Sequence, residues 1–227
     1  MRNYVGSIPV YWGMLMRDGI GRVLVLAPHT DDGELGCGAS IARFVEEGAD
    51  VFYAAFSTAD QSLPEGLPPG TLARELRAAT AVLRIPDANV LVYDYEVRKL
   101  SYVRQEILER LVQLRDDVQP DLVFMPCPHD VHQDHSTVAA EGLRAFKKVS
   151  ILGYELPWNT VEFSAQAFVG VTSEQVERKV SALSAYRSQV DKDYMQADFI
   201  RGWARMRGVQ IGTRLAEAFE VIRWVIM

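Results

Sequence analysis

Two kinds of hydrophobic pattern alternate along the chain. Short continuous apolar runs, such as RVLVLA at 22–27, are typical of strands buried on both faces. Between them, apolar residues recur every three or four positions, which is typical of helices that cover a sheet. The pattern predicts strands at 22–27, 50–56, 89–94, 121–126, 151–156, 166–172 and 218–227, and helices at 38–48, 71–85, 101–118, 136–148, 173–190 and 196–208.

This order of elements predicts the fold class. Strand and helix alternate four times before residue 150, which favours an α/β fold with a mostly parallel sheet and helices on both faces. The pattern is less regular over 151–227. We therefore expect a single domain over 1–227, with 1–20 as an N-terminal lead-in and 151–227 completing the pocket. Ser101, Ser136 and Ser173 are the expected caps of three helices.

Composition and charge limit the function classes. Apolar residues make up 48% of the chain, charged residues 24%, and the net charge is −6, which argues against a nucleic-acid surface. No run approaches the roughly 18 apolar residues of a membrane span, and the N-terminus lacks the pattern of a signal peptide. Two cysteines, Cys37 and Cys127, are too few for a disulfide framework. We expect a soluble, cytoplasmic protein.

All four histidines lie in two segments, APHTDDGELGCG at 27–38 and PCPHDVHQDHSTV at 126–138. Each segment follows a predicted strand and precedes a predicted helix. Ligands of open parallel sheets bind outside the carboxyl ends of the strands, so we expect the two segments to meet at one sheet edge. Four histidines interleaved with four aspartates indicate chemistry rather than ordinary polar surface.

Imidazole and carboxylate groups at this spacing predict a metal site. His29, Asp32 and His135 are the candidate ligands, because two histidines and one carboxylate with open positions are typical of catalytic zinc. Other divalent first-row metals accept the same donors. Asp31 is then free to act as general base, and His132 to protonate a leaving group or stabilise an oxyanion.

Several residues keep more than one interpretation. Asp134 can fix a histidine tautomer. Glu34 can cap a helix or support the site, Cys127 can pack or bind metal, and the loop 57–70 can be a lid or a plain connection. His129 and Asp130 can contact the metal ligands, face the substrate or be plain loop residues, and Arg98 can meet a substrate hydroxyl or phosphate or be an exposed arginine. Arg201 and Trp203 are candidates for lining a sugar pocket, and Trp203 is equally a candidate core residue.

At this point the motifs resemble those of a known family. PHTDDGELGCG resembles the P-H-P-D-D-x-E-L-G-x-G signature of the LmbE-like or PIG-L-like zinc-dependent de-N-acetylases, and HQDH at 132–135 resembles their H-x-D-H motif. KVSALSAYRSQV and GTRLAEAFEVI, near the C-terminus, are similar to two further stretches of that family. The resemblance covers the chain from about Arg22 to its end.

The resemblance implies a Rossmann-like fold and hydrolysis of an N-acetyl group. It implies His29, Asp32 and His135 as metal ligands, Asp31 as base, His132 as acid or oxyanion stabiliser, and Asp134 as the partner of His132. Two positions depart from the family pattern. Thr30 replaces a frequent Pro, and Arg84 replaces a Gly that usually follows a helix, which puts the end of that helix in doubt.

The predicted function is zinc-dependent removal of an acetyl group from an N-acetylglucosamine-like sugar or conjugate. One alternative keeps the metal and changes the amide, for example to a cysteinyl conjugate or an acyl-amino lipid. Another is a regulatory protein that binds a nucleotide or metal, but no G-x-G-x-x-G follows the first strand. The expected partner is a small acetylated sugar, without nucleic acid or membrane span, and a homo-oligomer is compatible with the apolar N-terminus.

Overall fold

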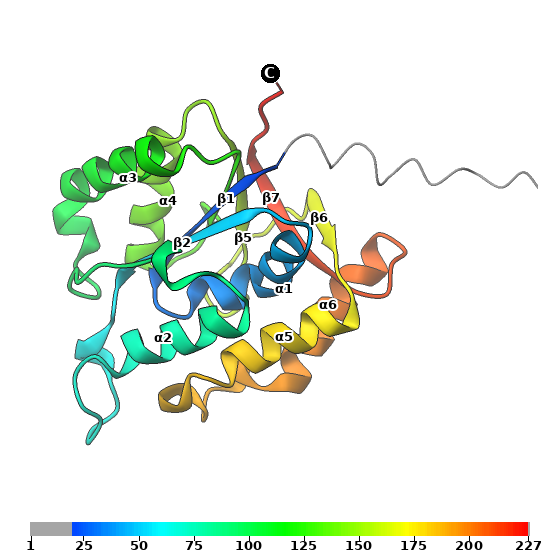
Figure 1. Cartoon of the computed structure of the whole chain (residues 1–227), viewed down its shortest axis with the longest axis horizontal. Coiled ribbons are helices and arrows are strands. Elements are labelled where there is room, and N and C mark those ends of the chain that lie inside the picture. The colour runs from blue at the N-terminus through cyan, green and yellow to red at the C-terminus, as the bar shows by residue number, and fades with distance from the viewer. Residues whose placement is uncertain (1–19, 227) are drawn as a thin grey trace, which may run out of the picture.

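The computed structural model describes residues 20–226, which form one seven-stranded sheet with helices on both faces (Figure 1). The predicted lead-in, except Ile20, lies outside the described residues. The strand order is β3-β2-β1-β4-β5-β7-β6. The strands are β1 Arg22–His29, β2 Asp50–Ser57, β3 Val90–Val92, β4 Leu122–Pro126, β5 Ser150–Tyr154, β6 Ala167–Gly170 and β7 Ala216–Arg223. The main helices are α1 Asp32–Glu46, α2 Thr71–Val82, α3 Arg104–Val118, α4 Gln133–Ala145, α5 Ser173–Leu183 and α6 Ala197–Gln210.

The sheet is mostly parallel, as predicted. Strands β1 to β5 pair in parallel, whereas β7 pairs antiparallel with both β5 and β6. Within the described residues, no helix is both long and apolar enough to cross a membrane.

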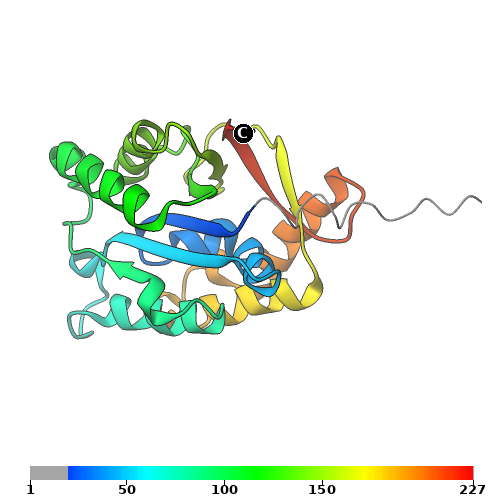
Figure 2. The ribbon, with the colours of Figure 1, turned by 45° about the horizontal axis from the view of Figure 1, so that its top comes forward.

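The continuous apolar run of β1 is explained by two hydrophobic cores, one on each face of the sheet. Val23 and Val25 face the core covered by α1, α2, α5 and α6, whereas Leu24 and Leu26 face the core under α3 and α4. Figure 2 shows the two helical layers on opposite sides of the sheet. Both faces of the strand are buried, so both sets of alternating residues are apolar.

The neighbouring strands β1 and β4 place the two histidine segments together. After β1 the chain enters α1 on one face of the sheet, and after β4 it enters α4 on the other face. The two connections therefore leave the carboxyl ends of adjacent strands toward opposite faces of the sheet, and a crevice opens between them. This is the position predicted for the site.

Helix α1 begins earlier than predicted and is kinked. It starts at Asp32 rather than Gly38, and Cys37 leaves helical geometry at φ −145° and ψ 24°. The Glu217 carboxylate accepts the N–H groups of Ala39 (3.2 Å) and Ser40 (2.7 Å) beyond the kink. Lys179 donates to the carbonyl of Leu35 before it (2.6 Å) and pairs with Glu217 (2.6 Å). These bonds satisfy the backbone groups that the kink releases.

The three predicted serine caps are wrong. Helix α3 follows the 3-10 turn Leu100–Val103 and has Val103 at its N-cap, without a side-chain bond. Helix α4 is capped by His132. Helix α5 is capped by Thr172, which forms a capping box with Gln175. In each of these helices the serine lies near the helix start but not at the N-cap.

Arg84, which departs from the family pattern, adopts a conformation that favours glycine. Helix α2 ends at Val82, and Arg84 has φ 64°. A side chain in this left-handed region is strained, by roughly 1 kcal/mol. We expect Arg84→Gly to raise the free energy of unfolding by about 0.5–1 kcal/mol, measured from the urea midpoint. Ala78→Gly, at an exposed position inside the same helix, should lower it by about 1 kcal/mol; destabilisation by both changes would contradict the strain argument.

Candidate metal centre and active site

A cavity of about 270 Å³ lies at the carboxyl ends of β1 and β4. Strand β1 ends with His29, and Asp31 and Asp32 begin α1, so these side chains are placed by the strand-to-helix turn. His132 and His135 come from the first turn of α4. The cavity is lined by His29, Asp31, Asp32, Leu35, His132, His135, Trp158, Asn159 and Tyr194.

Three side-chain atoms converge on one point in this cavity. His29 Nδ1 lies 3.1 Å from Asp32 Oδ2, His135 Nε2 lies 3.2 Å from the same oxygen, and the two nitrogens are 3.2 Å apart. Asp32 Oδ2 also accepts the backbone N–H of His29 (2.8 Å), which fixes the carboxylate. The structure thus brings together the three residues predicted as metal ligands.

The outer nitrogen of each of these histidines contacts a second carboxylate. His29 Nε2 lies 3.0 Å from Asp134 Oδ2, and His135 Nδ1 lies 2.7 Å from Asp130 Oδ2. A carboxylate on the outer nitrogen holds the proton there and leaves a lone pair on the inner nitrogen, as in many metal sites. Two lone pairs and a carboxylate oxygen then face each other without a donor between them, an arrangement that a cation would stabilise.

The spacing of these atoms fits one tetrahedral ion. Ligands about 2.0–2.1 Å from such an ion lie about 3.3 Å apart, close to the observed 3.1 to 3.2 Å. A second set, formed by His29, His132 and His135, has ligand atoms within 4.8 Å of one another. That spread exceeds the tetrahedral separation, so the set with Asp32 fits better.

The neighbouring carboxylates favour protonation of the two histidines when no cation is bound. Burial lowers the pKa of His29, but Asp32 and Asp134 offset this effect and raise the pKa to about 9. Burial likewise opposes charge on His135, while Asp32 and Asp130 raise its pKa to about 10. A cation must therefore displace protons from both rings at neutral pH.

Metal affinity should rise with pH. Because the pKa values of His29 and His135 are raised to about 9 and about 10, binding at pH 7 should release about two protons, and affinity should increase from pH 6 to pH 8. Calorimetry in buffers of different ionisation enthalpy measures the released protons. An affinity that is constant over this range, with no proton release, would exclude the two histidines as ligands.

Asp31 is the free carboxylate of the cavity. It occupies the N-cap position of α1, but its side chain does not cap the helix. Burial and the adjacent Asp32 carboxylate raise its pKa above the ordinary value. A half-buried carboxylate of raised basicity beside the converging ligand atoms suits proton transfer.

His132 presents a donor rather than an acceptor to the cavity. Its Nδ1 accepts the backbone N–H of Asp134 (3.2 Å), which assigns the neutral ring proton to Nε2. Burial, together with the like charges of His135 and His29, lowers the pKa of His132. A neutral imidazole with a free Nε2–H suits hydrogen bonding to a developing oxyanion.

Glu34 supports the turn that carries the ligands. It is fully buried, burial raises its pKa to about 8, and it accepts from the hydroxyls of Tyr53 and Tyr186. Both hydroxyls also contact the carbonyl of Thr30, at 3.1 Å for Tyr53 and 2.5 Å for Tyr186. The two phenols supply only two protons for these four contacts, so a protonated Glu34 would add a third donor to the network. These contacts favour the interpretation of Glu34 as a residue that supports the site.

The structure revises the expectation for Asp134. The family resemblance implies Asp134 as the partner of His132, but its carboxylate bonds to His29 and to the N–H groups of Arg98 (2.6 Å) and Leu100 (3.2 Å). Only the backbone of Asp134 contacts His132. Asp134 therefore orients His29, and it also fixes the loop that carries Arg98.

The predicted substrate contacts are not brought into the cavity. Arg98 and His129 are exposed and are absent from the residues that line it. Sequence reasoning did not identify Trp158, Asn159 or Tyr194 as cavity residues. They belong to the irregular C-terminal part, where hydrophobic periodicity gives no signal for a site.

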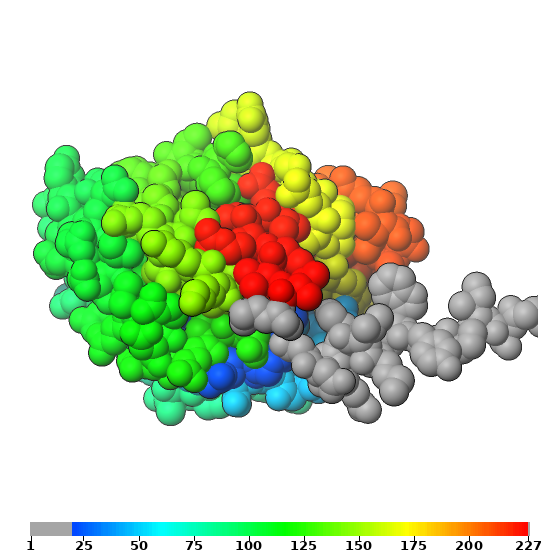
Figure 3. All heavy atoms as spheres, turned by 90° about the horizontal axis from the view of Figure 1, so that it is seen from above, coloured from blue at the N-terminus to red at the C-terminus, as the bar shows by residue number. Residues whose placement is uncertain are grey.

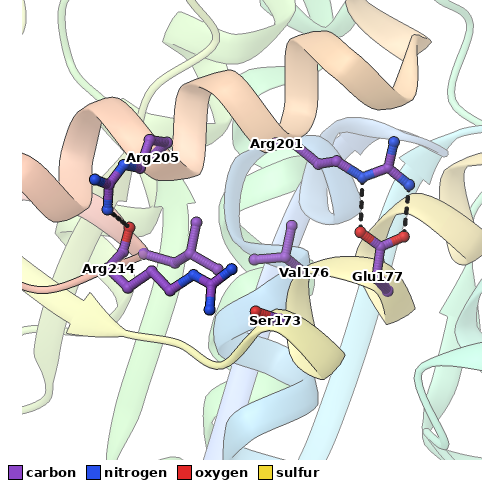
Figure 4. Close-up of a pocket in the computed structure, with 7 residues that line it drawn as sticks. Ser173, Val176, Glu177, Arg201, Arg205 and Arg214 are labelled. Atoms are coloured by element: carbon purple, nitrogen blue, oxygen red, sulfur yellow. Dashed lines mark hydrogen bonds and ion pairs between the residues drawn. The ribbon is translucent and has the colours of Figure 1, made fainter.

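Arg201 and Trp203 do not line this cavity, and Trp203 packs against the hydrophobic core, which was its alternative interpretation. Arg201 faces a separate hollow of about 610 Å³ between α5 and α6, where it forms two 2.7 Å bonds with Glu177 (Figure 4). Trp203 donates its indole N–H to the buried Glu155 carboxylate (2.7 Å). Both residues fasten α6 to its neighbours.

The fold and the cavity define a Rossmann-like α/β protein with a polar histidine and carboxylate site at a sheet edge. A model of the family described as PIG-L: GlcNAc-PI de-N-acetylase matches residues 24–146, more than half of the chain. The chain belongs to this family of deacetylases, and the predicted resemblance is confirmed.

Individual relatives agree with this assignment. The chain is 26% identical over 172 residues to an uncharacterized deacetylase, YaiS, of Escherichia coli (strain K12), covering 73% of this chain and 90% of the relative. It is 24% identical over 233 residues to a diacetylchitobiose deacetylase of Thermococcus kodakarensis, covering 92% and 85%. The structure of N,N'-diacetylchitobiose deacetylase from Pyrococcus horikoshii shares the fold, with a TM-score of 0.75, 23% identity, and 89% and 84% coverage.

Proposed function

We propose that this protein is a metal-dependent N-deacetylase that hydrolyses the acetamido group of an N-acetylglucosamine-bearing sugar. The observation that carries the proposal is the triangle of His29 Nδ1, Asp32 Oδ2 and His135 Nε2, with edges of 3.1 to 3.2 Å, beside a free carboxylate. Two nitrogens and one oxygen suit zinc, and other first-row divalent metals accept the same donors.

Different residues of the chain bind the metal, transfer the proton and stabilise the oxyanion during hydrolysis. A divalent cation held by the three ligands supplies Lewis acidity toward the amide carbonyl and water. Asp31 takes the proton of the attacking water, and His132 Nε2–H donates to the oxygen that becomes negative. Asp31 then returns the proton to the amine nitrogen as its C–N bond breaks. The products are acetate and a free amine.

The proposed substrate class rests on the family and on the site. The deacetylases of Thermococcus kodakarensis and Pyrococcus horikoshii are named for diacetylchitobiose. The cavity of this chain combines catalytic polar groups with the aromatic residues Trp158 and Tyr194. Arg98 and His129 are proposed to contact parts of the substrate outside the cavity.

Acetate release tests the proposal. The purified protein is incubated with N-acetylglucosamine and N,N'-diacetylchitobiose, before and after chelation and after addition of zinc, manganese, cobalt or nickel. We expect acetate and free amine in equal amounts, loss of both on chelation, and recovery with a metal. Absence of acetate with every metal and both sugars, while a cysteinyl conjugate or an acyl-amino lipid is hydrolysed, would assign the site to another amide.

A further inference from the structure

The hollow of about 610 Å³ between α5 and α6 is separate from the catalytic cavity. The two helices lie side by side on one face of the sheet (Figure 1), and the segment between α6 and β7 supplies Arg214 and Leu215 to the hollow. Among the described residues, none lines both the hollow and the cavity. A molecule bound here would therefore be distinct from the substrate in the cavity. We call this space the arginine hollow.

Three arginine side chains line the arginine hollow. Arg201 and Arg205 lie one turn apart on α6, and Arg214 lies before β7. Glu177 of α5 is the one carboxylate among the lining residues that the structure describes, so three guanidinium groups against one carboxylate leave two positive charges in excess. The chain as a whole has a net charge of −6. A local excess of positive charge in an acidic protein favours an anionic ligand.

Two of these arginines keep most of their donors for a ligand. Glu177 engages Arg201 through two 2.7 Å bonds. Arg205 gives one N–H to the carbonyl of Arg214 (3.0 Å), and its other nitrogens bond to no residue between 20 and 226. The Arg214 guanidinium forms no ion pair or hydrogen bond within the same range, and Figure 4 shows it extending along the hollow toward Ser173.

Arg205 and Arg214 are accessible from solvent. Both side chains are exposed, and Figure 3 shows the end of α6 and the turn after it, in orange, at the outer edge of the molecule. Hydrogen bonds from its own N–H and from Thr172, followed by the charge of Arg214, lower the pKa of the exposed Glu174 at the start of α5. Glu174 does not line the hollow, and water screens its interaction with Arg214.

The rest of the lining suits the organic part of a ligand. Val176 and Leu215 give the hollow an apolar surface, and both pack on the core below it. Ser173 is the first residue of α5, and the free N–H groups of a first helical turn favour an anion. The volume of about 610 Å³ lies within the range of about 300–1,000 Å³ that is typical of small-molecule pockets.

We propose that the arginine hollow binds a phosphate monoester. Such a group carries a charge of about −1.5 to −2 at pH 7, which matches the two excess positive charges of the lining. A guanidinium fork donates two parallel hydrogen bonds to phosphate oxygens, and phosphate has enough oxygens to accept from both Arg205 and Arg214. The esterified organic group then contacts Val176 and Leu215. This site goes beyond the proposed deacetylation and does not depend on it.

Calorimetric binding to the zinc-loaded protein tests the site. The probes are uridine 5'-monophosphate and glucose 6-phosphate, which distinguish a nucleotide from a sugar phosphate, and we expect at least one to bind with one molecule per chain. Arg214→Gln should weaken this binding about tenfold, and Arg205→Gln/Arg214→Gln about a hundredfold, because each change removes a charged hydrogen bond. Arg214→Lys keeps the charge without the fork and should weaken binding less than Arg214→Gln.

Lys147→Gln/Lys148→Gln provides a matched control. Both lysines are exposed and follow α4, which covers the face of the sheet opposite to α5 and α6. The control removes the same number of positive charges as the double arginine variant without touching the hollow. It should keep the wild-type affinity, and circular dichroism verifies the fold of every variant.

Four results would overturn the proposal. They are absence of binding of both monoesters to the wild type, equal affinity of the wild type and the double arginine variant, equal weakening in the lysine control, and binding of citrate as tight as that of the monoesters. Equal affinity together with a changed oligomeric state of the double arginine variant, measured by sedimentation, would assign the hollow to contact between copies of the chain. Because all these measurements record binding, they decide the site whether or not the protein releases acetate.

Discussion

Asp31→Asn is expected to lower turnover by about 10²–10⁴-fold while the protein retains its metal, because general base catalysis contributes on this scale. The Asp31 side chain does not cap α1, and asparagine has nearly the same shape. The substitution therefore removes proton transfer with little effect on the fold. The raised pKa of Asp31 places its basicity closer to neutrality than that of an ordinary aspartate.

The measurement combines acetate release with metal analysis of the same sample. Asp117→Asn is a suitable control, since Asp117 is exposed in the last turn of α3, which leads to the amino end of β4 at the sheet edge opposite the cavity. It should keep near-normal turnover. If Asp31→Asn retained near-normal turnover with its metal in place, another group would have to accept the proton.

Asp32→Ala is expected to abolish metal binding, whereas His132→Ala should keep the metal and lose about 10²–10³-fold in kcat. The two changes separate the two possible ligand sets. Asp32 Oδ2 lies within 3.2 Å of both ligand nitrogens, whereas the set that contains His132 spreads to 4.8 Å. His132 Nδ1 is also occupied by a backbone N–H.

Metal stoichiometry after dialysis against zinc decides between the two sets. We expect about one equivalent in the wild type and His132→Ala, and a negligible amount in Asp32→Ala and His135→Ala. Circular dichroism and thermal unfolding of each variant verify folding. Full loss of zinc from His132→Ala in a folded protein would instead make His132 a ligand.

The sequence predicted the fold class and the convergence of the ligand segments because both follow from local patterns. The apolar run of β1 requires burial on both faces, and polar residues directly after two such strands indicate a sheet edge. Helix starts were harder to predict: α1 begins at Asp32, in a polar segment without hydrophobic periodicity. The kink at Cys37 depends on Lys179 and Glu217, which are far away in the sequence.

The surroundings of the ligands could not be predicted for the same reason. Asp130 and Asp134 lie in the second histidine segment, but which histidine each one contacts depends on how β1 and α4 meet in the fold. Trp158 and Tyr194 join the cavity only through tertiary packing of the C-terminal part. Sequence patterns identify the residue types that perform chemistry, whereas their partners are fixed by contacts between distant segments.

Residues from the C-terminal part hold the segment that carries the ligands. The Tyr186 hydroxyl donates to the Thr30 carbonyl, and the Lys179–Glu217 pair bonds to α1. A fragment that ended at residue 146, where the family match stops, would contain every proposed ligand and both proposed proton-transfer groups. It would lack Tyr186, Lys179 and Glu217, whose hydrogen bonds fix the turn that carries the ligands and the start of α1. Metal binding at the proposed site should therefore depend on the whole sheet, and the two signature motifs transplanted alone should bind zinc poorly.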